Sequence, residues 1–235
     1  MAGIEVKNLQ KTYTAGENSL DVLNGVNLHI PEKSITVVLG RSGCGKTTLL
    51  RLVGGLESAD MGEINFDEAH RSTFVFQEAR LMPWLNVWDN VRFGLKNQEE
   101  KDAVIQSIIE TVGLKGFEKA YPNQLSGGMQ QRVAIARALA YEPSFIMMDE
   151  PFAALDYFTR EQMQRELLRL QKKRGISILF VTHSIDEALL LGDKIVVLEE
   201  GRIKAEFTVG QEKAERNLLD EQFIILKKQI IQQLA

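Results

Sequence analysis

The sequence of 235 residues lacks several features that define particular classes of protein. It contains one cysteine, Cys44, so the chain cannot form an internal disulfide, and a reducing compartment is its expected environment. Its longest apolar runs, at residues 188–191 and 195–198, are far shorter than the roughly 18 residues required to span a bilayer. The start of the chain has no basic segment followed by an apolar stretch, the pattern of a secretory signal. We therefore expect a cytoplasmic protein that reaches a membrane only through a partner.

The chain also lacks an excess of positive charge. Its 28 Lys and Arg residues are outnumbered by 32 Asp and Glu residues, which gives a net charge of −4. A broad basic surface for nucleic acid is therefore not expected. With 44% hydrophobic and 26% charged residues, the composition is that of an ordinary globular protein. A chain of this length can bury roughly 70 to 75% of its unfolded surface, so it needs no disulfides to fold.

Short apolar runs alternate with helical patterns along most of the chain. Residues 4–30 have the spacing of a half-buried sheet, with Asn24 and Gly25 as a turn signal, and predict an antiparallel opening. Further strands are predicted at residues 34–39, 63–66, 73–76, 145–148 and 176–181, and a closing hairpin at residues 194–198 and 202–207. Helices are predicted at residues 46–53, 157–174 and 185–191. This alternation indicates an α/β fold whose core sheet is mostly parallel.

Two segments are predicted to be helical throughout. From about residue 81 to residue 140 the spacing is helical, for example at Val104, Ile105 and Ile108, which predicts a helical lobe inserted into the sheet. Residues 221–234 predict an amphipathic helix with an apolar stripe of Phe223, Leu226, Ile230 and Leu234. Such a stripe is more typical of a core than of a partner surface, and a dimer contact is the alternative. We expect one domain at residues 1–208 and a helical tail at residues 209–235.

A phosphate-binding loop follows the strand predicted at residues 34–39. Residues 40–47 read GRSGCGKT, which matches the pattern G-x-x-x-x-G-K-[ST]. In such a loop, small residues let backbone N–H groups surround phosphate oxygens, while Lys46 adds charge and the hydroxyl of Thr47 is directed at magnesium. Arg41 and Cys44 occupy variable positions and fit a solvated charge and a small filler. The residues expected to bind a nucleotide are Gly40, Arg41, Ser42, Gly43, Cys44, Gly45, Lys46, Thr47 and Thr48.

An acidic pair follows the apolar strand predicted at residues 145–148. In an open α/β sheet, ligands collect at the carboxyl ends of the strands. We therefore expect Asp149 to hold magnesium through water and Glu150 to act as a base on a water beside the terminal phosphate. The alternative is an exposed acidic pair that caps the turn at Pro151.

Two further polar side chains are expected at the same edge of the sheet. His183 follows the apolar run ILFVT, so its imidazole could bind the terminal phosphate and orient the attacking water. Gln77 follows the run TFVF, and its amide could reach magnesium or water. Taken singly, each residue is more typical of a structural role.

A second anion-binding surface is predicted at residues 125–131, LSGGMQQ. Ser126, Gly127 and Gly128 begin a helix, where unpaired N–H groups and the positive end of the helix dipole favour an anion. One nucleotide rarely needs two such surfaces from a single subunit. We therefore expect two chains to pair head to tail, each completing the nucleotide site of the other.

These motifs, in this order, resemble the ATP-binding subunit of an ABC transporter. The corresponding family elements are the Walker A loop at residues 40–47, the Q-loop at Gln77, the signature at residues 125–131, the Walker B strand and catalytic glutamate at residues 145–150, the D-loop at residues 154–156 and the switch histidine at His183. The resemblance implies a P-loop NTPase core of RecA-like type, with an N-terminal antiparallel β subdomain and an inserted α-helical subdomain. It also implies ATP and Mg2+ as ligands.

The resemblance assigns roles to individual residues. The metal would be held by Thr47, Gln77 and Asp149, and catalysis would depend on Lys46, Gln77, Glu150 and His183. The second copy would contribute Ser126, Gly127, Gly128, Gln130 and Asp156 to ATP binding. Tyr13 would stack on adenine, for which an aromatic ring face is suited, and the alternative is an ordinary tyrosine of the sheet surface.

The run FQEARLMPWLNVWDNV, residues 76–91, resembles the bacterial importers of nitrate, sulfonates, taurine and similar small solutes. That resemblance implies that the partners are integral membrane permease subunits and that the protein lies on the cytoplasmic face of the membrane. A periplasmic or extracellular substrate-binding protein would be an indirect partner, through the permease. A groove for a short permease helix is predicted from Leu81, Met82, Trp84 and Trp88. The alternative is that these residues belong to the core of the helical lobe.

Two other classes of ABC protein are compatible with part of this pattern. An ABC ATPase of an envelope complex that signals or remodels without moving solute carries the same motifs. A DNA-associated ABC ATPase separates its phosphate loop and signature by a very long coiled coil. Because Lys46 and Leu125 are only 79 positions apart (125 − 46), the DNA-associated class is the weaker alternative.

Overall fold

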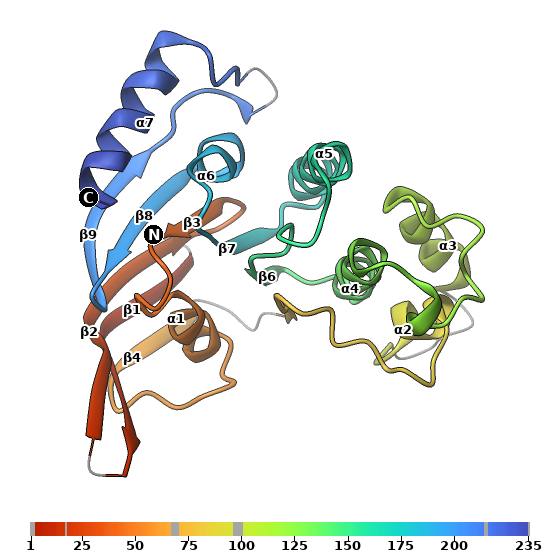
Figure 1. Cartoon of the computed structure of the whole chain (residues 1–235), viewed down its shortest axis with the longest axis horizontal. Coiled ribbons are helices and arrows are strands. Elements are labelled where there is room, and N and C mark those ends of the chain that lie inside the picture. Colours follow the sequence, from red (N-terminus) through yellow and green to blue (C-terminus); the bar gives the residue numbers. More distant parts are fainter. Residues whose placement is uncertain (1–2, 17, 67–70, 96–100, 214–215, 235) are drawn as a thin grey trace.

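The computed structural model describes residues 3–16, 18–66, 71–95, 101–213 and 216–234. A core sheet runs through the molecule, with a second sheet on one side and a lobe of helices on the other (Figure 1). The core sheet has the order β5-β6-β7-β3-β8-β9. Its strands are β3 (Ile35–Leu39), β5 (Ser72–Val75), β6 (Phe145–Asp149), β7 (Ser177–Thr182), β8 (Lys194–Glu199) and β9 (Arg202–Thr208). All neighbouring pairs are parallel except β8 with β9, so the expectation of a mostly parallel sheet is confirmed.

The N-terminal sheet is antiparallel, as expected, with the order β2-β1-β4. Its strands are β1 (Gly3–Ala15), β2 (Asn18–Pro31) and β4 (Met61–Phe66). The two faces of the core sheet are covered by different elements, and β3 shows the alternation. Val38 packs in a cluster with α1 (Lys46–Val53) and the antiparallel sheet, whereas Val37 and Leu39 pack in a second cluster with the helices of the opposite face. Burial on both faces explains why the central strands are continuous apolar runs.

The helical lobe contains α2 (Val87–Arg92), α3 (Asp102–Thr111) and α4 (Gly127–Ala140), with a short 3-10 turn at Pro122–Gln124. Residues 96–100 of the predicted lobe lie outside the described part of the chain. Both α2 and α3 pack against α4. The buried amide of Asn90 accepts a hydrogen bond from the backbone N–H of Met82 and donates to the carbonyls of Met82, Leu85 and Asn86. This one side chain therefore fixes the loop that leads into α2.

The remaining helices are α5 (Tyr157–Arg174), α6 (Ile185–Leu191) and α7 (Glu221–Leu234). The last of these packs on α6 and β8. Phe223 and Ile230 are buried there, and Leu226 and Leu234 pack at the edge of the same cluster, so the predicted apolar stripe faces the body of the protein. Within the described ranges, none of the helices is long and apolar enough to cross a membrane.

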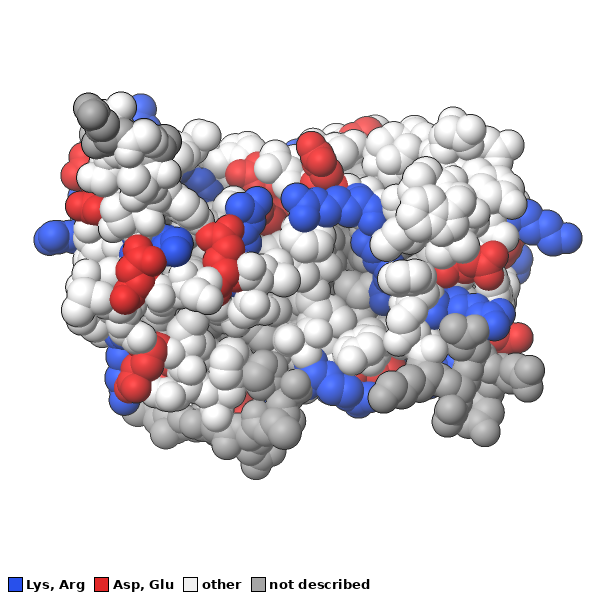
Figure 2. Space-filling model, turned by 90° about the horizontal axis from the view of Figure 1, so that it is seen from below, with Lys and Arg blue, Asp and Glu red and all other residues white. Residues whose placement is uncertain are grey.

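Charges of both signs are interspersed over the face seen from below (Figure 2). Lys and Arg side chains lie along the rim of a central hollow, and Asp and Glu side chains lie close to them. Among the residues drawn on that face, no field of one sign is continuous, which agrees with the net charge of −4.

Candidate nucleotide-binding site

The phosphate loop lies between the end of β3 at Leu39 and the start of α1 at Lys46. Two of its residues can only be small. A Cβ at Gly40 would lie 2.3 Å from the carbonyl oxygen of Leu198, and a Cβ at Gly45 would lie 2.7 Å from that of Val22. Gly45 also has a φ of 103°, a conformation that glycine adopts readily. The loop is therefore pressed against the backbone of β2 and β8, and larger residues do not fit.

The lysine of the loop is buried at its centre. The ammonium of Lys46 donates to the carbonyl oxygens of Gly40 at 2.9 Å and Arg41 at 2.8 Å. The sulfur of Cys44 lies 4.0 Å from the same ammonium, and burial raises the pKa of its thiol. Arg41 is exposed. The loop thus folds around its own positive charge.

A hollow of about 640 Å3 opens beside the loop. It is lined by Val22, Ser42, Gly43, Gly45, Lys46, Thr47, Thr48, Gln77, Glu150 and His183. These residues come from β2, the phosphate loop, α1 and the segments that follow β5, β6 and β7. The structure therefore brings together residues that the sequence predicted from four separate motifs. Val22 was not predicted, because it has the pattern of an ordinary strand residue.

Asp149 is the last residue of β6 and is only 5% exposed. Its carboxylate accepts a hydrogen bond of 3.2 Å from the hydroxyl of Thr47. Burial raises the pKa of Asp149, while the hydrogen bond from Thr47 and the nearby charge of Lys46 act in the opposite direction. Oxygen ligands of this kind suit Mg2+. Thr47 and Gln77 line the hollow, whereas Asp149 does not line it and is linked to it by its hydrogen bond with Thr47. Thr47, Gln77 and Asp149 are therefore a set of oxygen donors that fits a Mg2+ ion.

Glu150 and His183 meet at the carboxyl ends of the adjacent strands β6 and β7. Nδ1 of His183 lies 2.9 Å from Oε2 of Glu150, and the histidine side chain is 67% exposed. Glu150 has a φ of 44°, an uncommon conformation for a residue with a side chain. Such a backbone costs about 1 to 2 kcal/mol and is most often retained at functional sites. The geometry leaves one carboxylate and one imidazole side by side at the hollow.

Tyr13 lies at the edge of this region and does not line the hollow. Its hydroxyl is hydrogen-bonded to the carboxylate of Glu57, and burial together with that bond raises its pKa. The ammonium of Lys11 lies 5.5 Å from the ring centroid. The ring itself is partly exposed and remains available for stacking. Glu57 had no pattern in the sequence that could have indicated this contact.

The predicted second anion-binding surface lies at the start of α4. Ser126 is the N-cap residue, and its hydroxyl accepts a 3.2 Å hydrogen bond from the N–H of Met129. Ser126 and Gly127 are exposed. A Cβ at Gly128 would lie 3.3 Å from the carbonyl oxygen of Ala154, so the tip of α4 contacts the loop before α5. None of the three residues lines the hollow of its own chain.

Two other residues expected to act on the second copy have local roles in the fold. Asp156 is the N-cap of α5 and accepts a 3.0 Å hydrogen bond from the N–H of Thr159. Hydrogen bonds from the side chain and the backbone of Thr159 lower the pKa of Asp156. The amide of Gln130 donates to the carbonyl of Pro122 at 2.8 Å. Neither residue lines the hollow.

Two residues of α4 to which the sequence assigned no individual role hold the segment around Gln77. The buried amide of Gln131 donates to the carbonyl of Phe76 at 2.9 Å. The guanidinium of Arg137 donates to the carbonyls of Ala79 and Arg80. The helix that begins with the signature is therefore bonded directly to the segment that carries Gln77. Gln131 closes the LSGGMQQ motif, but nothing in the motif indicates its partner.

The model of the ABC transporter family matches residues 23–153, more than half of the chain. The chain belongs to the ABC transporter family. It is an ABC-type ATPase, and its N-terminal antiparallel sheet, mostly parallel core and helical insertion are those of solved ATP-binding cassettes. A dimeric cassette in a post-hydrolysis state with bound ADP and Pi superimposes with a TM-score of 0.82 at 34% identity, over 89% of this chain and 100% of that one.

The ABC ATPase also resembles curated proteins of importers. An aliphatic sulfonates import ATP-binding protein of Granulibacter bethesdensis is 47% identical over 82% of this chain and 79% of its own length. The corresponding protein of Bacillus cereus is 38% identical over 98% of this chain and 95% of its own. An uncharacterized ABC transporter ATP-binding protein of Methanocaldococcus jannaschii is 44% identical over 97% and 90%. The predicted resemblance to the import branch for nitrate, sulfonates and taurine is thus confirmed by relatives named for sulfonate import.

Proposed function

We propose that this ABC ATPase powers the import of a small solute of the aliphatic sulfonate, nitrate or taurine type by closing on ATP as a head-to-tail dimer. The observation that carries the dimer is the position of Ser126, Gly127 and Gly128. Their helix tip is exposed and stands outside the hollow of its own chain, so a second copy must supply it. The dimeric state of the solved cassettes supports this pairing. The names of the sulfonate relatives support import.

In the proposed site, residues 40–48 hold the phosphates of ATP, and Lys46 offsets their charge. Thr47, Gln77 and Asp149 would hold Mg2+, which when bound would neutralise charge on the phosphates. Glu150 takes a proton from the attacking water, and His183 holds that water and the terminal phosphate in line. Tyr13 stacks on the adenine ring from the edge of the hollow.

The second copy completes each site with the tip of its α4, assisted by Gln130 and Asp156. Because α4 is bonded through Gln131 and Arg137 to the segment around Gln77, movement of this helix and of the Q-loop segment is coupled. In this proposal the ATPase domain spans residues 1–208, and residues 209–235 form a tail that supports it.

The permease is proposed to dock beside the Q-loop segment, at the cytoplasmic face of the membrane. Of the four residues expected to form the groove, Leu81 and Trp88 pack against the core of the lobe and Met82 is half-buried. Trp84 is 69% exposed. The groove prediction therefore narrows to Trp84 as the side chain that a short permease helix would cover. A substrate-binding protein outside the membrane would select the solute.

Reconstitution tests the proposal. The ATPase is co-expressed with the permease that co-purifies with it and with the corresponding substrate-binding protein. Uptake of radiolabelled sulfonate, nitrate and taurine into proteoliposomes is then measured with ATP inside. We expect uptake that needs the binding protein, stops in the Glu150→Gln variant and is weakened in Trp84→Ala. Tyr141→Ala, which removes an exposed aromatic side chain at the C-terminal end of α4, is the control. ATP hydrolysis stimulated by the permease without uptake of any solute would favour an envelope remodelling complex and contradict import.

A further inference from the structure

We propose that Arg216 is a positioning residue for hydrolysis, which holds His183 in place through α6. It lies far along the chain from the ATP motifs, and no motif of the sequence includes it. The inference rests on the proposed role of His183, and it assigns to the segment before α7 the task of keeping His183 in position.

Arg216 caps the C-terminal end of α6. Its guanidinium, 9% exposed, donates from Nη1 to the carbonyls of Leu189 at 2.9 Å, Leu190 at 3.1 Å and Gly192 at 2.7 Å. The carbonyls at the end of a helix have no partner within the helix, and a cation there also complements the helix dipole. The other donors of Arg216 bind the carbonyls of Gln211 and Val209, so the guanidinium joins the end of α6 to the segment that follows β9.

The other end of α6 is bonded to the residues around His183. The hydroxyl of Thr182 accepts from the N–H of Ser184 at 3.0 Å and donates to the buried carboxylate of Glu187 at 2.6 Å. Ser184 caps α6 by accepting from the N–H of Glu187. The two residues that flank His183 in the sequence, Thr182 and Ser184, are therefore both hydrogen-bonded to Glu187 in the first turn of α6. A displacement of this short helix displaces the backbone of His183 with it.

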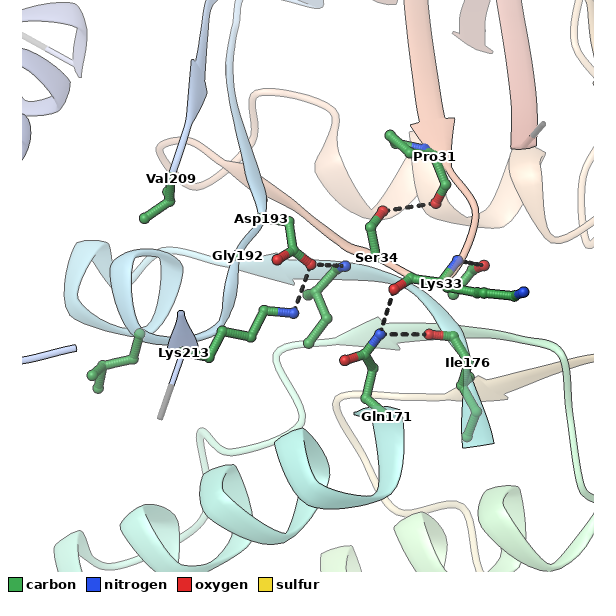
Figure 3. A network of polar contacts seen from close by, with 12 residues as sticks. Pro31, Lys33, Ser34, Gln171, Ile176, Gly192, Asp193, Val209 and Lys213 are labelled. Atoms are coloured by element: carbon green, nitrogen blue, oxygen red, sulfur yellow. Dashed lines mark hydrogen bonds and ion pairs between the residues drawn. The ribbon is translucent and has the colours of Figure 1, made fainter. Parts of the chain in front are cut away.

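The C-terminal segment is also bonded to the strand that leads into the phosphate loop. The carboxylate of Asp193 accepts from the N–H of Ile35, the first residue of β3, at 2.7 Å and from the ammonium of Lys213 at 2.6 Å (Figure 3). The backbone N–H of Val209 donates to the carbonyl of Asp193. On α7, Lys227 pairs with Asp186 in the first turn of α6 at 2.5 Å. Residues 209–227 thus contact both ends of α6, and through Asp193 they connect this helix to β3.

This arrangement matters because the side chain of His183 has few partners, while its backbone is held by β7 on one side and α6 on the other. Its side chain is mostly exposed, and Glu150 is the one side-chain partner in the described structure. The direction of the imidazole therefore depends on how β7 and α6 together place the backbone of His183. Arg216 does not line the nucleotide hollow, so its loss should leave ATP affinity unchanged and lower the rate of the chemical step.

Steady-state hydrolysis by the full chain, with rates normalised to nucleotide-binding protein, tests the inference. We expect Arg216→Met to lower kcat by about tenfold and to leave the KM for ATP within about twofold, because a small misplacement of a reacting group is costly. Arg216→Lys keeps the charge with a single donor group and should restore about half of the loss on a logarithmic scale. Lys172→Met is the matched control. It removes an exposed ion pair between α5 and Glu212 of the same segment, and kcat should not change.

A double-mutant cycle separates this role from a purely structural one. In a His183→Ala background, adding Arg216→Met should cause no further loss of kcat, because the group that it positions is already absent. A further tenfold loss, or wild-type kcat in both Arg216 variants, would overturn the inference and leave the proposed function intact. Wild-type turnover in His183→Ala would instead remove the proposed role of His183. Should Arg216→Met fail to fold, the cycle is run with Arg216→Lys, for which about threefold loss of kcat is expected and no loss refutes the inference.

Discussion

Replacing Glu150 with glutamine keeps the shape of the side chain and removes the carboxylate that we expect to accept a proton from water. The amide can still bond to His183, and the left-handed backbone at φ 44° is equally strained in both proteins. Because the imidazole is mostly exposed, loss of the ionic character of this contact should cost at most about 1 kcal/mol of folding free energy. For a protein of this size, Tm should fall by no more than about 4 °C.

The expected effect on hydrolysis is much larger. A general base contributes roughly 10² to 10⁴ in rate, which corresponds to about 3 to 5 kcal/mol in the activation free energy. Phosphate release should therefore fall by at least about 100-fold, while Mg-ATP binding, followed by fluorescence of a labelled nucleotide, should stay within about twofold. Light scattering should then detect a stable ATP-bound dimer, because the step that reopens it is blocked.

Glu200→Gln is the matched control for this experiment. Glu200 is also a glutamate with positive φ, 47°, but it is exposed in the turn between β8 and β9 and does not line the hollow. Its glutamine variant should hydrolyse ATP at the wild-type rate. Wild-type turnover in Glu150→Gln would show that the base lies elsewhere, and loss of ATP binding in that variant would contradict the separation of binding from chemistry.

Four further substitutions test other parts of the structure. Burial raises the pKa of Asp149, so the folded protein holds this proton more tightly than the unfolded chain does, and ionisation of the carboxyl lowers stability at high pH. Asp149→Asn should therefore raise the Tm of the metal-free protein at pH 8, and calorimetry should show that this gain disappears toward pH 4. The same variant should lose Mg-dependent hydrolysis. Gly40→Ala places a Cβ 2.3 Å from the carbonyl of Leu198, so we expect at least about 2 kcal/mol of destabilisation in urea and loss of ATP binding. Ile230→Ala should lower the free energy of unfolding by about 3 kcal/mol, because the Ile230 side chain is fully buried. Ile231 is 47% exposed, so Ile231→Ala should change that free energy by under about 0.5 kcal/mol. An ATP-bound dimer that is weakened only by Ile231→Ala would show that α7 serves dimerisation.

Local signals in the sequence were sufficient for most elements of the fold. The helix predicted at residues 157–174 begins and ends where it was expected, because Asp156 caps its start and Gly175 ends it in a left-handed conformation. The site residues at strand exits were predictable for a similar reason, since the carboxyl ends of parallel strands meet at one edge.

Long-range contacts could not be predicted in this way. Gln131 and Phe76 are 55 positions apart, and nothing near either residue specifies their hydrogen bond. Arg216 reads as one cation among many in a polar stretch, and its role depends on the carbonyls at the end of α6. The predicted groove is only partly exposed for the same reason. Its four apolar residues share a pattern, and only the packing distinguishes Trp88, which is partly buried against the core of the lobe, from the exposed Trp84.

The position of Cys44 limits how these experiments can be carried out. It is the one thiol of the chain, and it lies within 4.0 Å of the lysine at the centre of the phosphate loop. Its side chain packs against the core cluster beside Gly40, so a maleimide dye attached there would distort the phosphate loop. Fluorescent labelling through the native cysteine would therefore inactivate the enzyme that it is meant to report on. Spectroscopic probes should therefore be introduced at new surface cysteines in a Cys44→Ala background, after that background has been shown to bind ATP.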